Sequence, residues 1–563
     1  MAIELVRAEG GRAESGLFSL PWTQTYSPLA SPIASVAISA LPILALLVAI
    51  AVFRVRAHLA ALLGLGIALA VAIFAYGMPA RLAASAAALG AGYGLLPIGW
   101  LVLNVLFLYR LTVQHGLFQR LQEQVGGITP DRRLQLLLIA FCFGAFFEGC
   151  AGFGAPVAIT AAMLVGLGFA PVGASRLALI ANTAPVAFGS LGTPILALSA
   201  ASGLPLMMLS AMVGRQLPFF SLLVPFWLVM AFAGFRGMRE VWPAILVAGL
   251  AFAIPQFLVS NFHGPWLVDV ASSLASIGCL AWFLRRWRPA RIWSAVEGRD
   301  GGEPAEHIPV RIDWQAWLPW LILSLGVFLW GLPVTKVLLD GLFAPKLPVP
   351  WLDGFVLRVP PVVAAPRAEP AVFAFNILSA TGTGILVSAI VAGRAMGAGA
   401  REMAATWVAT LRLALLPLLT IAAMLALGYV TRYSGMDSVI GLSLAQSGFL
   451  YPFFGTMLGW LGVAATGSDT ASNALFGGLQ RTTAEQLGIN PVLMAAANSS
   501  GGVMGKMADA QSIVVAATAT GIRGREAEIL RYVLFHSVAL AALVGLLVMG
   551  QAYVWPLTTM VVR

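Results

Sequence analysis

Apolar segments long enough to cross a lipid bilayer recur along the whole chain, and they constrain its fold more than any other feature. A membrane-spanning helix needs roughly 20 mostly apolar residues, and about twelve segments of this kind follow one another in the sequence. Hydrophobic residues make up 60% of the chain and charged residues 10%, a balance that excludes a soluble globular protein. The sequence therefore predicts an all-α polytopic membrane protein with one transmembrane domain over 32–556.

The charge pattern favours contact with lipid over contact with nucleic acid. The net charge is +10, but the Arg residues lie between apolar segments and not on a soluble face. This arrangement is typical of the positive-inside rule and of anionic headgroups. Residues 1–31 mix acidic and basic side chains without the basic-then-apolar order of a signal peptide. We expect them to form a solvated or interfacial tail.

Basic residues also orient the chain, because loops rich in Lys and Arg remain on the cytoplasmic side. Arg54 and Arg56 follow the first apolar segment, and a long basic loop covers 285–316. The Pro-rich segment 333–370 has few basic residues and is expected outside. Counting the apolar segments between these loops places both termini outside.

Cysteine and histidine give no sign of a metal or redox site. Cys142, Cys150 and Cys279 lie within apolar segments and show neither a CxxC motif nor Cys/His spacing. None of the five His residues falls in an HExxH motif, and the chain has no GxxxxGK[ST] loop. We therefore expect no disulfide, no metal and no cofactor.

Two regions of the chain contain the same parts in the same order. In 134–205, an apolar helix leads to Glu148, a GCAGFGAP turn, LGFAPV and IANTAP. In 449–522, an apolar helix leads to TGSDTASN, LGINPV and AANSSGG. By the charge pattern, the first helix leaves the cytoplasm and the second enters it, so the regions are expected to be inverted repeats. Helix breaks are expected at Gly152, Gly154, Pro156, Gly467, Gly501 and Gly502.

Inverted repeats with broken apolar segments point to the binding site of a secondary transporter. Unwound backbone at membrane depth is tolerated only where protein encloses it or where it lines a wet cavity. The polar residues near the expected breaks are therefore predicted to bind substrate; they are Asn182, Thr183, Asn498, Ser499 and Ser500. Interhelical packing is the better interpretation for a single Ser or Thr, but not for Asn residues in both regions. We expect Asn182 and Asn498 to face one central cavity.

Three charges lie clearly inside these apolar regions: Glu148, Asp469 and Lys506. An ionisable residue at that depth costs at least about 2.5 kcal/mol. A carboxyl with little water around it can bind and release a proton, which predicts proton coupling at Glu148 or Asp469. Glu148 is alternatively a structural acid bonded to its own glycine turn, and Asp469 is equally an N-cap. Lys506 either holds a substrate carboxylate or pairs with Asp469 or Asp509.

Four long blocks also support a family resemblance. They are RLQLLLIAFCFGAFFEGCAGFGAPVAI (Arg133–Ile159), LIANTAPVAFGSLGTPI (Leu179–Ile195), GWLGVAATGSDTASNALFGGLQ (Gly459–Gln480) and AANSSGGVMGKM (Ala496–Met507). These blocks resemble the signature blocks of the bacterial L-lactate permease family. The resemblance runs from Trp22 to near the C-terminus.

The resemblance implies a symporter that imports L-lactate, with related 2-hydroxy monocarboxylates such as D-lactate and glycolate, together with protons. It also implies the bacterial cytoplasmic (inner) membrane and an ion-transporter-like scaffold with a moving transport unit and two re-entrant hairpins. The chain departs from the family at Asp509 and Ala510, where the family usually has Ser-Pro. Gln511, which follows this departure, is included among the expected substrate-binding residues.

Other classes of function fit the sequence less well. A membrane enzyme would need a nucleophile with a base, or a metal-ligand cluster, and a channel favours a pore ring built by several copies. A sodium-coupled carboxylate transporter is the nearest alternative, because unwound backbone beside Asn, Ser and Thr can also hold sodium. The sequence leaves a homo-oligomer open.

Overall fold

The chain is mainly helical, and the computed structural model describes residues 21–53, 55–150, 155–293, 313–363, 365–522 and 525–563. Within these residues, ten helices are long and apolar enough to cross a membrane, or eleven if one bent pair counts as a span. The sequence suggested about twelve, a count that included segments which form shorter apolar helices of 10–17 residues. The multi-pass architecture predicted from hydropathy is confirmed.

Most helices lie outside the two regions with the shared order of parts. They are α1 (Pro32–Ala51), α2 (Ala57–Ala70), α3 (Ala80–Tyr93), α4 (Trp100–Gln114), α5 (Leu117–Gly126), α11 (Leu206–Val213), α12 (Leu217–Glu240), α13 (Trp242–Phe262), α14 (Val268–Leu284), α15 (Trp314–Gly331), α16 (Pro333–Leu342), α17 (Thr381–Ala395), α18 (Ala400–Ser434), α19 (Met436–Leu444) and α24 (Glu526–Tyr553).

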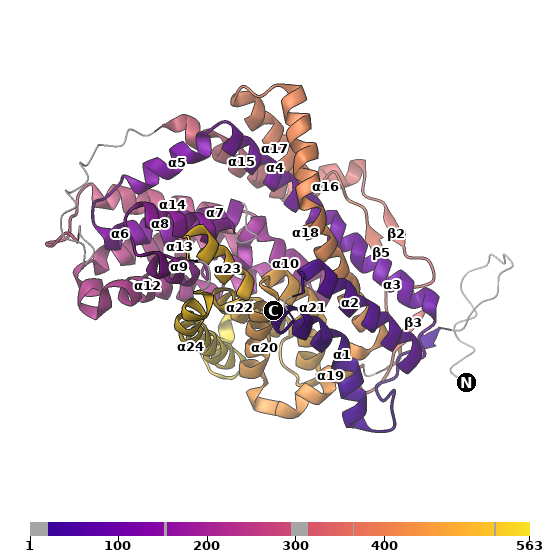
Figure 1. The fold of residues 1–563 in the computed structure, drawn as a ribbon. Helices are drawn as coiled ribbons and strands as arrows, with labels where there is room; N and C mark the ends of the chain where they lie inside the picture. The colour runs from indigo at the N-terminus through magenta and orange to yellow at the C-terminus, as the bar shows by residue number, and fades with distance from the viewer. Residues whose placement is uncertain (1–20, 54, 151–154, 294–312, 364, 523–524) are drawn as a thin grey trace.

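The long helix α18 packs closely against α2 and α3, and Figure 1 shows the three side by side. Glycine makes this approach possible, because a Cβ on Gly90 would lie 2.5 Å from the backbone oxygen of Leu425. Gly94 meets the backbone of Ala422 in the same way, at 2.7 Å. Small residues that let helix backbones approach are typical of packing in membranes.

The first core region comprises α6 (Arg132–Leu136), the π-helical turn η3 (Leu137–Phe143), α7 (Gly144–Cys150), α8 (Ala155–Gly166), α9 (Pro171–Ala181) and α10 (Gly189–Ser202). Its first half is a hairpin: Arg132 Nη1 donates to the carbonyl of Gly168 at 3.0 Å, so the chain returns after α8 to the end from which it left. The chain then reverses into α9 and continues into α10 after a bend of 65°.

The second core region comprises α20 (Tyr451–Thr466), α21 (Asp469–Gln486), α22 (Pro491–Gly505) and α23 (Ala510–Ala519). Its first half is also a hairpin, in which the Tyr451 hydroxyl at the start of α20 donates to Gln480 Oε1 near the end of α21 at 2.8 Å. In both regions, a glycine with positive φ and a proline make the next reversal: Gly168 before Pro171, and Gly488 before Pro491.

The two core regions run in opposite directions. Near the start of α9, Ser175 Oγ lies 2.9 Å from Thr520 Oγ1, just beyond α23. At the end of α10, the Ser202 carbonyl accepts from Arg481 of α21 at 2.9 Å. The path α9–α10 thus runs from the end of α23 towards the end of α21, whereas α22–α23 runs the other way. The helices also pack reciprocally, α10 on α21 and α23 on α8, as a two-fold relation between the regions requires.

The segment between α16 and α17 contributes four strands to two small sheets, and a fifth strand comes from near the N-terminus. One contains β1 (Trp22–Thr23), β3 (Val356–Arg358) and β4 (Arg367–Ala368), and the other contains β2 (Lys346–Pro348) and β5 (Val372–Ala374). The strand β1 differs from the solvated tail expected for residues 1–31, because it pairs in parallel with β3. Gln24 then donates to the carbonyl of Tyr433 at 2.9 Å. These contacts fix the described end of that tail to α18.

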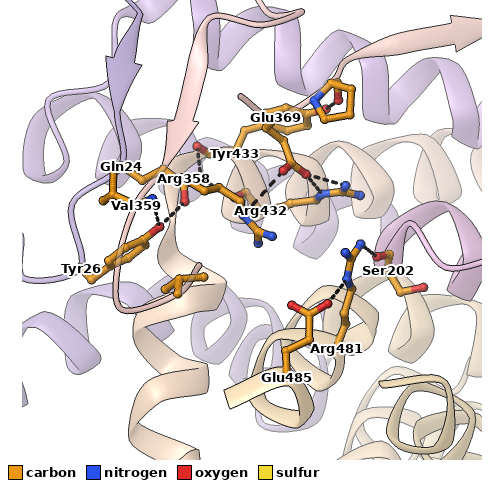
Figure 2. Close-up of polar contacts among 12 residues, drawn as sticks. Gln24, Tyr26, Ser202, Arg358, Val359, Glu369, Arg432, Tyr433, Arg481 and Glu485 are labelled. Carbon is orange, nitrogen blue, oxygen red and sulfur yellow. Dashed lines mark hydrogen bonds and ion pairs between the residues drawn. The ribbon is translucent and has the colours of Figure 1, made fainter. Parts of the chain in front are cut away.

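An ion cluster ties this segment to the end of α18 (Figure 2). Glu369 Oε1 accepts from Arg432 Nη2 at 2.6 Å, and Glu369 Oε2 lies 3.7 Å from Arg358 Nε. Burial alone would raise the pKa of Glu369, but the guanidinium groups of Arg432 and Arg358 outweigh it and hold this pKa below its usual value. Arg481 joins the cluster to the end of α10 through Ser202.

A second ion cluster lies at the start of the first core region. Arg133 is fully buried and pairs with Asp131 at 2.8 Å and with Glu240 at 2.7 Å. It also donates to the carbonyl of Arg291 at 2.8 Å, which fixes the first part of the basic loop 285–316 against α6. Residues 294–312 of that loop lie outside the described residues.

Candidate functional site

A cavity of about 320 Å³ lies between the two core regions and α18. The first core region contributes Glu148, Val186, Gly189, Ser190, Thr193 and Pro194. The second contributes Thr466, Gly467, Ser468, Asp469, Thr470, Ala471, Ala474, Lys506, Gln511, Ser512 and Val515. The opposite wall is formed by Leu416, Pro417, Thr420, Ile421, Met424 and Leu425 of α18, with Ala57 of α2.

The cavity lies where the helices of both core regions are interrupted. Gly467 separates α20 from α21 and has a φ of +73°, a conformation that glycine adopts without strain. The start of α10 is irregular, with positive φ at Ser190, Leu191 and Gly192. Between α22 and α23, Asp509 caps the second helix by accepting from the Ser512 amide at 2.7 Å. The N-termini of α10, α21 and α23 therefore lie around one cavity.

Lys506 is the cation in this cavity. Its Nζ donates to the carbonyl of Gly467 at 2.6 Å and lies 3.4 Å from Asp509 Oδ2. Of the two acidic partners that the sequence offered, the structure therefore pairs Lys506 with Asp509 and not with Asp469. The contact to Gly467 also joins the end of α22 to the break between α20 and α21.

Asp469 is buried and part of a polar network. Its Oδ2 accepts from Ser499 Oγ at 2.6 Å and from Asn473 Nδ2 at 3.2 Å, whereas Oδ1 has no hydrogen-bond partner in the described part of the chain. The N-cap alternative for Asp469 is wrong, because Ser468 is the N-cap and accepts from the Ala471 amide. Asp469 is the first residue of α21, and it lines the cavity.

Glu148 lies at the end of the first hairpin arm and is 5% exposed. Its Oε2 has no hydrogen-bond partner among the described residues. The Asn182 side chain is close enough to act on the carboxyl, although its Nδ2 is not aligned for a hydrogen bond. Gly189 leaves room for Glu148, since a Cβ there would lie 2.8 Å from Oε1. Residues 151–154 of the glycine turn, to which the structural alternative assigned this acid, lie outside the described residues.

Four residues predicted to bind substrate or proton line the cavity, namely Glu148, Asp469, Lys506 and Gln511, together with the predicted helix break at Gly467. Neither Asn182 nor Asn498, which were predicted to face one central cavity, is among the described residues that line this one. Asn498 instead donates to Asn473 Oδ1 at 2.9 Å, behind Asp469.

The remaining polar candidates satisfy their hydrogen bonds within the protein. Thr183 Oγ1 donates to the carbonyl of Ile180 at 2.8 Å, and Ser500 Oγ donates to Gln216 Oε1 at 2.7 Å. Ser499 supports Asp469 from behind and is not among the described residues that line the cavity. These residues stabilise the site or its surroundings without lining the cavity.

The expected helix breaks have mixed outcomes. Gly467 lies at a break, but Gly501 and Gly502 lie inside the continuous helix α22. At these two positions glycine allows neighbouring groups to approach the helix closely. A Cβ on Gly501 would lie 2.3 Å from the carbonyl oxygen of Thr456, and one on Gly502 would lie 2.5 Å from Asp469 Oδ1. Pro156 is the second residue of α8. Gly152 and Gly154 lie outside the described residues.

Sequence reasoning missed the apolar wall and one buried acid. The wall residues belong to α18, whose sequence is that of an ordinary apolar helix. Pro417, a proline inside this helix, was the one local feature that could have drawn attention to it. Asp269 lies in the first turn of α14, is 1% exposed, and packs against α7 beside Glu148, since a Cβ on Gly149 would lie 2.7 Å from Asp269 Cβ. As a single acid in an apolar segment, Asp269 could have been found by the criterion that selected Glu148. Within the described residues, no group of three or more His, Cys, Asp or Glu residues could hold a metal ion.

Opposed, interrupted helices around a cavity that contains buried charged residues are typical of a secondary membrane transporter. Comparison with known proteins gives the family: a family model described as L-lactate permease matches residues 35–555. The chain belongs to the L-lactate permease family. It is thus a multi-pass membrane protein of a family of transporters.

Three curated relatives match the chain over nearly its full length. The glycolate permease GlcA of Escherichia coli strain K12 is 46% identical over 95% of this chain and 98% of its own length. The L-lactate permease of the same strain is 43% identical over 95% and 98%. The L-lactate permease of Bacillus subtilis strain 168 is 44% identical over 95% and 99%. Among solved structures, Neisseria gonorrhoeae MtrF, from a class of antimetabolite efflux pumps, is 15% identical over 83% of each chain, with a TM-score of 0.43.

Proposed function

We propose that this chain imports L-lactate and related 2-hydroxy monocarboxylates, such as D-lactate and glycolate, across the bacterial cytoplasmic (inner) membrane in symport with protons. The names of the relatives support lactate and glycolate as substrates. In this proposal Lys506 holds the substrate carboxylate, Glu148 binds the proton, and Asp469 is the alternative or second proton site. The comparisons give no support to the sodium-coupled alternative.

The charge balance of the cavity is the observation that carries this proposal. Among the described lining residues, Lys506 is the one cation, and it faces the acids Glu148 and Asp469. Asp509 already pairs with Lys506. An ionised carboxylate buried without partners costs several kcal/mol, and a substrate carboxylate adds one more negative charge. Anion binding is therefore favourable only when Glu148 or Asp469 is protonated, which links substrate binding to proton binding.

The walls of the cavity suit a small hydroxy acid. One side presents the ammonium of Lys506, the amide of Gln511 and the N-termini of α21 and α23, where partial positive charge favours an anion. The facing wall presents Leu416, Ile421 and other apolar side chains of α18. A 2-hydroxy acid that places its carboxylate and hydroxyl on the polar side would place its short carbon chain against the apolar side.

Proton coupling also has an energetic reason. A lactate anion entering alone works against an inside-negative potential, at roughly 2.3 kcal/mol per charge per 100 mV. Entry with one proton is electrically neutral and adds the pH gradient as a driving force. We further expect the two core regions to move together relative to α18, so that the cavity opens to each side in turn.

Uptake into proteoliposomes tests this function. Wild-type protein should accumulate labelled L-lactate and glycolate, and acetate less well, when the outside is made acidic, and a sodium gradient should not replace the proton gradient. Lys506→Gln should lower uptake at subsaturating lactate roughly tenfold or more, because a hydrogen bond to a charged group contributes about 1.5–3 kcal/mol.

Lys346, exposed on β2, provides the matched control. Lys346→Gln removes the same charge far from the cavity and should leave uptake unchanged. Wild-type vesicles that take up lactate equally well without a proton gradient would exclude proton symport. Normal lactate affinity in Lys506→Gln would show that Lys506 does not hold the substrate carboxylate, but it would leave the rest of the proposed function intact.

A further inference from the structure

Asp269 is a buried carboxyl held between the ends of three helices. The turn before α14 packs against the irregular start of α10, since a Cβ on Gly192 would lie 2.7 Å from Pro265 Cβ. On the other side, a Cβ on Gly149 of α7 would lie 2.7 Å from the Cβ of Asp269 itself. Asp269 therefore adjoins α7 at the residue after Glu148, but it is not among the described lining residues of the cavity.

The carboxyl of Asp269 has no compensating partner in the described part of the chain. Neither Oδ1 nor Oδ2 accepts a hydrogen bond there, and no Lys, Arg or His forms an ion pair with it. Trp266 and Leu267, which precede Asp269 in the chain, are also buried, with exposed fractions of 4% and 6%. An ionised carboxylate in such a place is strongly unfavourable, so Asp269 holds a proton in this conformation.

Two ionisable groups act on Asp269 from the described residues packed against it, the carboxyl of Glu148 and the thiol of Cys150, both on α7. Two neighbouring carboxyls with little water cannot both ionise at ordinary cost, and such groups titrate as a pair. Glu148 also leaves Oε2 without a hydrogen-bond partner in the described residues. The pair therefore retains at least one proton while the other is exchanged.

We propose that Asp269 is a second proton-binding residue of the transport cycle, which shares protons with Glu148 from behind the cavity. The step conserves charge: a proton leaves the carboxylic acid of one residue and binds a carboxylate oxygen of the other, directly or through one water. Glu148 faces the cavity and exchanges the proton with it, and Asp269 holds the proton that Glu148 does not. This inference rests on the proposed proton symport and adds a second residue to it.

The position of Asp269 permits both protonation states. Burial and the neighbouring Glu148 favour the neutral acid, whereas the first turn of α14 favours an anion through the helix dipole. A residue with these opposed influences can release its proton when Glu148 gains one. A purely structural acid in the same place would remain neutral throughout the cycle.

The test compares the pH profile of lactate uptake with lactate counterflow at equal pH on both sides. Asp269→Asn keeps the size of the side chain but removes its proton. We expect counterflow within twofold of wild type, and a pH profile of proton-driven uptake whose midpoint lies about one pH unit higher or more. The shift is upwards because the ionised Glu148 then loses the proton that a neutral Asp269 shares with it, and its carboxylate is less stabilised. Asp269→Glu retains a titrating group and should keep the profile closer to wild type than Asp269→Asn does.

Asp437→Asn is the matched control, since Asp437 is another buried acid, 3% exposed, on α19 and away from the described lining of the cavity. It should leave the pH profile unchanged. A wild-type profile in Asp269→Asn would overturn the inference while leaving proton symport intact. Asp269→Asn could instead lose counterflow. If Asp269→Glu, which still titrates, loses counterflow to the same extent or more, the inference is also overturned, because the size of the side chain and not its titration would then matter. Absence of proton-driven uptake in the wild type would instead reject the proposed function.

Discussion

The two acids of the cavity come from different core regions, yet a glycine makes room for each. A Cβ on Gly189 would lie 2.8 Å from Glu148 Oε1, and one on Gly502 would lie 2.5 Å from Asp469 Oδ1. A larger residue at either position would displace the carboxyl. The glycines around these acids therefore belong to the site, although neither glycine binds anything itself.

Replacing Glu148 by Gln tests its assignment as the proton site. Glu148→Gln should abolish proton-driven accumulation of lactate while leaving exchange between preloaded vesicles, because exchange does not require release of the proton. The exposed acid Glu123 on α5 offers the control, and Glu123→Gln should behave as wild type. If Glu148→Gln still accumulates lactate with the wild-type pH dependence, the acid is structural and the coupling site is Asp469.

At the scale of elements, helix contacts made through glycine hold the cavity together. The clearest case joins α20 to α22, where a Cβ on Gly459 would lie 2.1 Å from the carbonyl oxygen of Asn498. That contact supports the network in which Asn498 bonds Asn473 and Asn473 bonds Asp469. The distance between these two helices therefore controls the position of the Asp469 carboxyl.

Gly459→Ala should destabilise the protein by roughly 1–3 kcal/mol or more, because backbone cannot move aside as a side chain can. Gly66→Ala is the matched control, since a Cβ at Gly66 on α2 meets nothing within 4 Å and alanine favours a helix over glycine. Melting temperatures in detergent should fall for Gly459→Ala and hold or rise for Gly66→Ala. Equal melting temperatures would show that α20 and α22 adjust without cost.

The ion cluster around Glu369 makes a prediction about pH. Because Arg432 and Arg358 hold the pKa of Glu369 below its usual value of 4.5, this acid stabilises the fold at neutral pH. The contribution is fully present above the usual pKa and is lost as pH falls through the lowered one. Wild-type protein should therefore melt above Glu369→Gln at pH 7, and the difference should shrink only in acid below the usual pKa. A difference that stays constant down to pH 3 would show that Glu369 is not the titrating group.

At the scale of the whole molecule, the two core regions run in opposite directions and enclose the cavity against α18. This arrangement does not by itself say which end faces the cytoplasm. That assignment rests on the basic residues of the loops, among them the described stretch Arg285–Trp293, which packs against α6.

Cysteine labelling decides the orientation. In a Cys279→Ser background, Ala290→Cys should react with an impermeant reagent only after the cells are opened, and Gly341→Cys should react from outside. Both positions are exposed, and a Cβ at Gly341 meets nothing within 4 Å. Cys142 and Cys150 are buried and should not interfere. The reverse labelling pattern would show that the protein has the opposite orientation in the membrane, and would contradict the positive-inside assignment.

The membrane class, the family and the main charged residues of the cavity could all be predicted from the sequence. Long apolar segments have only one stable environment, so hydropathy settles the class. Glu148, Asp469 and Lys506 stood out because a charge inside such a segment is costly and must be enclosed with others. Gly467 stood out because its surroundings cannot continue a helix.

The tertiary structure alone decided which polar residues face the cavity. Gly501 and Gly502 looked like a break, yet α22 continues through them, because the neighbouring helix α20 approaches closely enough to require their small size. The apolar wall of α18 and the pairing of Asp269 with α7 depend on contacts between residues far apart in the chain. Local pattern shows where a helix is weak or a charge is unusual, but the side chain that lies opposite is set by how distant helices pack.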